Sequence, residues 1–149
     1  MRALLRALFA VAACAAPALA VADPSATNGA IDQAFGDHAK YEAVILSFQK
    51  AVAAHDAAAV AELVSYPIVV SVNGRKSTIQ SAKAFIAAYD AIMTPDIVAA
   101  VTTQKYEDLF VTSHGVMFGN GQVWVNGVCK DEACKRLDVK VITIQHTDK

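Results

Sequence analysis

The sequence predicts a single α+β domain in which amphipathic helices come first and strands come last. Apolar residues recur with the helical period between residues 41 and 52. Asn73-Gly74, the dipeptide typical of tight β-hairpins, separates two short β-prone segments. The last third of the chain is rich in Val, Ile, Phe and Thr, and Gly119-Asn120-Gly121 interrupts it. Because helices and strands are segregated along the chain, α+β is favoured over a parallel βαβ array.

The strongest helical signal is an apolar face with spacings of i, i+3, i+4, i+7 and i+11. Its members are Tyr41, Val44, Ile45, Phe48 and Val52. This pattern predicts a helix over residues 39–54, and Asp56 is a good N-cap for a shorter helix over 57–64. Pro67 ends that second helix, because proline disfavours helical geometry in the residue before it.

The middle of the chain predicts one hairpin and two more helices. Residues 68–72 and 75–79 are the expected strands of the hairpin. A helix that ends at about Ile92 follows, and Ser81 is its expected N-cap. Thr94-Pro95-Asp96 starts another helix, since proline is favoured at the first helical position and an acid in the first turn.

The C-terminal third predicts three long antiparallel strands, over residues 108–118, 122–128 and 137–144. His114-Gly115 lies in the middle of the first strand and predicts a bend or a bulge there. Helices packed on one side of a curved antiparallel sheet would leave a ligand cavity between the residue 41–52 helix and the sheet.

Residues 1–22 have the layout of a secretory signal peptide. Arg2 and Arg6 form a positive start, a short apolar run follows, and small residues supply two cleavage sites at Ala20 and Ala22. The apolar run is too short to span a bilayer, which disfavours an N-terminal membrane anchor. The sequence therefore predicts a periplasmic or secreted protein.

A second form of export stays open at the N-terminus. Cys14 ends a tetrapeptide that looks like a lipobox, so a lipoprotein anchored at this cysteine is the alternative to ordinary cleavage. After the signal peptide, residues 23–37 are polar, small and poorly periodic, and we interpret them as a flexible linker. Residues 38–149 are then the single folded domain.

The charge balance excludes partners that need a basic surface. The chain has 13 basic and 14 acidic residues. Two of the basic ones lie in residues 1–22, so the remainder has 11 against 14 and a net charge of −3. We therefore expect no nucleic-acid partner. No later apolar run approaches the spanning length of about 20 residues, so an integral membrane protein is not expected.

Cys129 and Cys134 are expected to form a disulfide, because a close pair in an oxidising compartment usually does. A zinc site completed by His114 or His146 is one alternative, although a closed zinc site needs four ligands. A redox-active pair is another, although redox motifs have two residues between the cysteines and here there are four. We expect no metal and no cofactor.

The order of the elements resembles the nuclear transport factor 2-like superfamily, and within it a group of small exported bacterial proteins. The likeness covers residues 39–145 and is carried by Tyr66-Pro67, Phe85, Tyr89-Asp90, Asp108-Leu109-Phe110-Val111, His114 to Gly121 and Val123-Trp124-Val125. It implies a cone-shaped curved sheet packed against N-terminal and middle helices. The superfamily contains isomerases, dehydratases, cyclases and non-catalytic binding proteins, so the fold does not choose among activities.

His114 and Asp90 are the candidate catalytic residues. His114 lies in an apolar, β-rich stretch at the predicted bulge, and histidine is the natural acid/base near neutral pH. Enolisation-type members of the superfamily use an Asp–His pair, which the resemblance would carry over to Asp90 and His114. The structural alternatives are a hydrogen-bonded or solvent-facing sheet histidine and a solvated helix aspartate.

Tyr66, Gln122 and Trp124 are the candidate ligand-binding residues. Trp124 is the only tryptophan of the chain, and with Phe110, Phe118 and Tyr66 it could line an aromatic pocket. Gln122 lies two residues away on the same predicted strand and would supply a polar anchor. The same strand face could equally be exposed to solvent.

Two functions follow from these residues. The first is an exported, non-catalytic binding or accessory protein that holds a small molecule in the cavity or forms a homodimer through the sheet face. The second is a small acid/base enzyme, of isomerase or dehydratase type, that uses His114. The absence of a dense polar constellation in the sequence favours the first.

Overall fold

The computed structural model describes residues 23–147. The predicted signal peptide, with Cys14, lies outside these residues, so export and lipidation stay predictions. Within residues 23–147, no helix combines the length and the apolar character that crossing a membrane requires.

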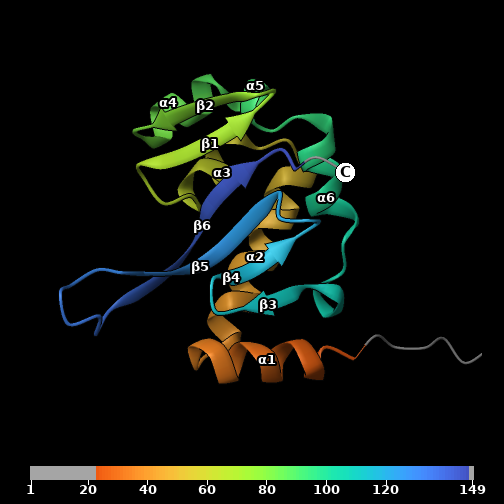
Figure 1. Cartoon of the computed structure of the whole chain (residues 1–149), viewed down its shortest axis with the longest axis vertical. Coiled ribbons are helices and arrows are strands. Elements are labelled where there is room, and N and C mark those ends of the chain that lie inside the picture. Colours follow the sequence, from red (N-terminus) through yellow and green to blue (C-terminus); the bar gives the residue numbers. More distant parts are fainter. Residues whose placement is uncertain (1–22, 148–149) are drawn as a thin grey trace, which may run out of the picture.

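The chain is an α+β domain, as predicted (Figure 1). Its helices are α1 (Ser25–Phe35), α2 (His38–Ala53), α3 (Ala57–Glu62), α4 (Ala82–Ala87), α5 (Tyr89–Ile92), α6 (Pro95–Thr103) and the 3-10 turn η1 (Tyr106–Asp108). Its strands are β1 (Ile68–Val72), β2 (Arg75–Ile79), β3 (Phe110–Thr112), β4 (Gly115–Phe118), β5 (Val123–Cys129) and β6 (Leu137–Gln145). Figure 1 shows α2 running along one face of the sheet, with α1 at one end and α4 and α5 at the other.

The six strands form one mixed sheet in the order β2-β1-β6-β5-β4-β3. β1 and β6 are parallel, with Val70 beside Ile144, whereas every other neighbouring pair is antiparallel. The prediction of a wholly antiparallel sheet is therefore wrong for the β1–β6 pair. The connection from β1 to β6 passes through β2, three helices and three strands, and a connection of that length permits parallel pairing.

The segment predicted as a linker, residues 23–37, is largely the helix α1. Thr27 and Ile31 are buried, and the Thr27 hydroxyl donates a hydrogen bond to the Glu107 carbonyl at 3.0 Å. Gly36 ends the helix in the left-handed conformation, with φ at 93°. The prediction failed because the buried side of α1 has few apolar residues, so its sequence lacks a helical hydrophobic pattern.

The strand predicted over residues 108–118 is two strands, β3 and β4, joined by a tight turn at Ser113-His114. Gly115 allows this reversal, because its φ is 136° and a Cβ there would lie 2.5 Å from the Val125 carbonyl oxygen. Of the predicted bend or bulge, the structure has the sharper form of the first, a full reversal of the chain, and His114 is exposed at the tip of this turn. The sheet does have an irregularity, between Trp124 and Val125 of β5.

The predicted apolar face of α2 forms the centre of the core. Tyr41, Ile45, Phe48 and Val52 are buried. The ring centroids of Phe48 and Phe118 are 6.0 Å apart, so α2 packs directly on β4. Side chains occupy the interface in which the sequence suggested a ligand cavity, and the pockets described below lie at other places.

The Cys129–Cys134 disulfide is confirmed, with the two Cα atoms 4.7 Å apart at the end of the β5–β6 hairpin. Hydrogen bonds hold the same turn independently of the sulfur atoms. The Asp131 carboxylate accepts from the backbone N–H groups of Lys135 at 2.8 Å and Arg136 at 3.0 Å. The first of these bonds is the main reason that the pKa of Asp131 is lowered.

Replacing Phe48 with alanine should lower the free energy of unfolding by about 3–5 kcal/mol, because the change leaves a cavity beneath β4. Leu46→Ala on the same helix is the matched control. Leu46 is 46% exposed, and its loss should change stability by about 0.5 kcal/mol or less. Urea denaturation followed by tryptophan fluorescence measures both. A loss below about 1 kcal/mol for Phe48→Ala would contradict the assigned helix face.

Reduction of the disulfide should destabilise the domain by about 2 kcal/mol without unfolding it, since the closed loop is short and Asp131 still holds the turn. Alkylation of the denatured, unreduced protein should modify neither cysteine. Labelling of both cysteines without reductant would show that the bond is absent. Far-UV circular dichroism before and after reduction checks that the fold persists.

Candidate functional site

The two faces of the sheet are covered differently. One face packs against α2 and contributes the fully buried residues Phe118, Val123 and Ile144. The opposite face, called here the outer face, carries the alternate residues of the same strands. The strand register aligns one row of them across four strands, in the order Phe110, Met117, Trp124 and Thr143.

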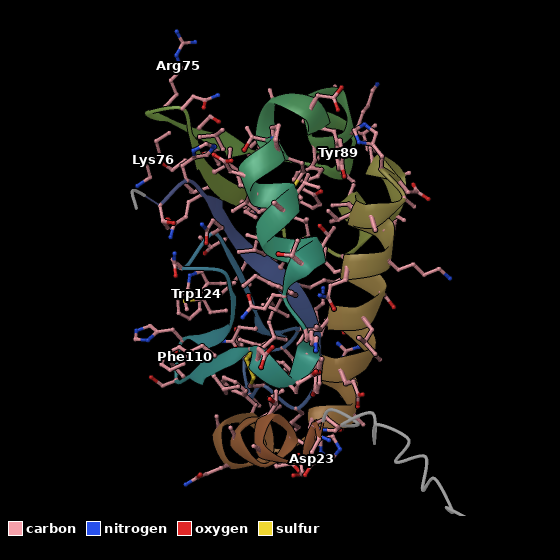
Figure 2. All side chains as sticks on the ribbon, turned by 90° about the vertical axis from the view of Figure 1, so that its right-hand side faces the viewer. Asp23, Arg75, Lys76, Tyr89, Phe110 and Trp124 are labelled. Carbon is pink, nitrogen blue, oxygen red and sulfur yellow. A yellow bond between two sulfur atoms is a disulfide. The ribbon has the colours of Figure 1, made fainter. Side chains whose placement is uncertain are left out.

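Large apolar side chains of the outer face remain uncovered. Phe110 at one end of the row is 58% exposed, and Val69 of β1, on the same face, is 43% exposed. Figure 2 shows Phe110 and Trp124 projecting from the side of the sheet that is away from α2. The centre of this face is also uncharged, since Ser71 and Gln145 pair beside the aligned row.

His114 and Trp124 come together on the outer face. Their ring centroids are 6.5 Å apart in an edge-to-face arrangement. With Ile142, Thr143 and Gln145 they line a shallow hollow of about 410 Å³. No hydrogen bond joins the His114 ring to another described side chain, whereas its backbone carbonyl accepts from the Asn126 amide at 3.0 Å. The described contacts of His114 are therefore those of a surface residue.

Tyr66 lies in a different pocket, of about 500 Å³, beside Glu62 and Lys140. Its hydroxyl donates to the Ala61 carbonyl at 3.0 Å, and its ring packs edge-on against Phe85. Burial, followed by the nearby Glu62 carboxylate, raises the pKa of Tyr66 to about 12. Tyr66 is therefore a neutral, structurally engaged phenol near neutral pH.

Gln122 lies in a third pocket, of about 470 Å³, with Asp96 and His146 among its lining residues. Its side-chain oxygen accepts from the Asn120 backbone N–H at 2.5 Å and so holds the turn before β5. The three predicted ligand-binding residues thus line three separate pockets, and none of them shares a pocket with another.

Asp90 pairs with His55 and not with His114. The Asp90 Oδ1 and His55 Nε2 atoms are 3.1 Å apart, and both side chains are mostly exposed. His55 follows the end of α2 with φ at 54°, and its ring packs edge-on against Tyr89. α5 and the β3–β4 turn lie at opposite ends of the sheet (Figure 1), so the candidate Asp–His pair is not assembled.

The sequence grouped Phe110 and Phe118 with Trp124. The strand register keeps Phe110 in the same row as Trp124, whereas Phe118 is buried against Phe48 of α2. Met117, which lies between Phe110 and Trp124 in this row, was missed from the sequence, because the predicted single strand over 108–118 hid the alignment. Strand alternation within 110–112 and 115–118 could have found it, had the turn at Ser113-His114 been recognised. Within residues 23–147, no group of three or more His, Cys, Asp or Glu side chains is arranged to hold a metal ion.

Comparison with known proteins leaves the site to be interpreted from its own chemistry. No family model matches the chain, and neither a curated protein nor a solved structure matches it. The proposals below therefore rest on the residues of this chain alone.

All four tyrosines should ionise above their ordinary pKa of about 10 in the folded protein. Burial is the largest cause that raises the pKa of Tyr41, Tyr66, Tyr89 and Tyr106. The unfolded chain releases the phenol protons near pH 10, whereas the folded chain releases them at higher pH. The free energy of unfolding should therefore fall as the pH rises from about 10 to about 12.

Absorbance at 295 nm during an alkaline titration measures this difference between the folded and unfolded chains. Tyr66→Phe should remove about one quarter of the amplitude, since the chain has four tyrosines. A phenol that ionises at or below pH 10 while the chain is still folded would refute the burial argument. Circular dichroism at each pH identifies the folded range.

Proposed function

We propose that the chain is an exported, non-catalytic binding or accessory protein that acts through the outer face of its sheet. The observation that carries this proposal is the uncharged row of Phe110, Met117 and Trp124, in which Phe110 is exposed and Met117 and Trp124 are half-buried. Aromatic residues and methionine are enriched at the centres of protein interfaces, and charged residues are depleted there. The export part rests on the sequence of residues 1–22.

The positions of the acid/base candidates favour binding over catalysis. General acid/base catalysis needs a titrating group with an orienting partner and a charge stabiliser. His114 is at an exposed turn beside Trp124, Asp90 pairs with His55, and the Tyr66 phenol donates to a backbone carbonyl. No two of these three candidates touch, so no observation favours the enzyme.

The partner that we propose is a second copy of the chain. The Phe110–Met117–Trp124 row carries no charge that would repel its own copy, and two sheets can pack face to face about 10 Å apart. A two-fold axis through the face would bring the Phe110–Met117–Trp124 row of each copy onto the other. Large aromatic side chains would then be buried from both sides.

We also propose a cone of the nuclear transport factor 2-like kind. Its support is the order of elements, with helices first, then a hairpin, further helices and four strands. The irregularity at Trp124-Val125 adds a source of curvature, because a bulge bends a strand and increases its twist. In such a cone the helices fill one face of the sheet and leave the other face for contact.

The mature chain should be a dimer at micromolar concentration, and Trp124→Lys should convert it to a monomer. Burying a lysine without a partner at the centre of an interface should raise the dissociation constant by at least about 30-fold. Sedimentation equilibrium measures the change. If the wild-type chain is still monomeric at about 100 μM, its self-association is weaker than that of specific interfaces of standard size, and the dimer is ruled out.

Leu46→Lys is the matched control for this experiment. Leu46 is also an exposed apolar residue, but it lies on α2 and not on the outer face. The dimer should survive this change. Dissociation of Leu46→Lys as well would mean that the association does not depend on the outer face, and circular dichroism checks that both variants are folded.

A further inference from the structure

A second surface lies on the helix side of the sheet, between the β1–β2 hairpin and α5. This groove has a volume of about 490 Å³. Val70 and Val72 of β1 and Ile92 of α5 are among its lining residues, and all three are buried. Its volume is within the range of about 300–1,000 Å³ that is usual for small-molecule sites.

The hairpin register places polar groups over this apolar wall. Val72 pairs with Arg75, and Val70 pairs with Ser77, so Arg75 and Ser77 share the groove face with the two valines. Lys76 lies between them in sequence and pairs with Ser71, so it belongs to the opposite face. Figure 2 shows Arg75 and Lys76 at the tip of the hairpin, pointing in different directions.

Arg75 is available to a ligand. It is the one charged residue among those that line the groove. It forms no ion pair or side-chain hydrogen bond with another residue in the range 23–147, although six ion pairs occur there. The groove therefore combines an apolar wall with one cation, Arg75, and the hydroxyl of Ser77.

We propose that this groove binds a small amphipathic carboxylate. The apolar part of the ligand lies against Ile79, Ala88 and Ala91, the accessible apolar residues of the lining. Its carboxylate accepts hydrogen bonds from the Arg75 guanidinium and the Ser77 hydroxyl. Arginine suits this role, because its planar fork matches the two oxygens of a carboxylate. The site is on the helix side of the sheet, so the inference does not depend on the proposed dimer, which leaves the groove open.

Isothermal titration with decanoate tests the proposal on the folded mature chain. Decanoate should bind with one site per chain. Decanol, which has the same chain without the charge, and decyltrimethylammonium, which has the opposite charge, should each bind at least about tenfold more weakly, the effect of losing one charged hydrogen bond. Equal binding of all three probes would show that only apolar surface is recognised and would overturn the proposal.

Arg75→Gln and Lys76→Gln form a matched pair, since each removes one positive charge from the same turn. Arg75→Gln should weaken decanoate binding about tenfold, whereas Lys76→Gln should change it less than about twofold. Equal losses in the two variants would mean that the hairpin attracts anions without a defined site. The absence of saturable decanoate binding by the wild-type chain would also overturn the proposal.

Ala91→Trp locates the site independently of charge. Ala91 is an exposed residue that lines the groove, so a larger side chain there should occupy the apolar wall at little cost to folding. This variant should lose decanoate binding, while Trp124→Lys on the outer face should retain it. Retained binding in folded Ala91→Trp would place the ligand elsewhere and contradict the proposal.

Discussion

The packing of α2 on the sheet is the constraint on which the rest of this structure depends. Phe48 against Phe118 fixes the distance between helix and sheet, and the Tyr41 hydroxyl fixes the position along it by donating to the Asn126 side chain at 3.0 Å. Asn126 in turn donates to the carbonyl of His114. A single contact region therefore positions α2, β5 and the β3–β4 turn, and it decides which face of the sheet is covered.

The position of α2 on one face of the sheet explains both proposed surfaces. With one face filled by α2, the Phe110–Met117–Trp124 row on the other face is only partly covered by the described residues, and an apolar surface of this kind is typical of an interaction site. The β1–β2 hairpin lies away from α2 and is backed by α5, which consists of only four residues, Tyr89–Ile92. A short helix covers only part of the hairpin, and the uncovered part is the groove at Arg75.

Much of the fold could be predicted from the sequence, because its elements have strong local signals. The face of Tyr41, Ile45 and Phe48, the Asn73-Gly74 hairpin and the disulfide are all as expected. The failures occur where local signals are weak or ambiguous. α1 buries few apolar residues, and the turn at Ser113-His114 lies in a β-prone stretch where His114-Gly115 indicated only a bend or a bulge. The parallel pairing of β1 with β6 is a property of the whole chain, which no local pattern contains.

The candidate site shows even more clearly the difference between what local sequence predicts and what tertiary structure decides. The sequence by itself determined which residue types were available, which segments form helices and strands, and that the two cysteines can pair, because each of these depends on neighbours along the chain. Only the tertiary structure decided that Trp124 lies with His114, that Asp90 lies with His55, and that Tyr66 and Gln122 line separate pockets. The physical reason is that a site is a set of distances between distant residues, and strand register and helix packing, not local propensity, set those distances.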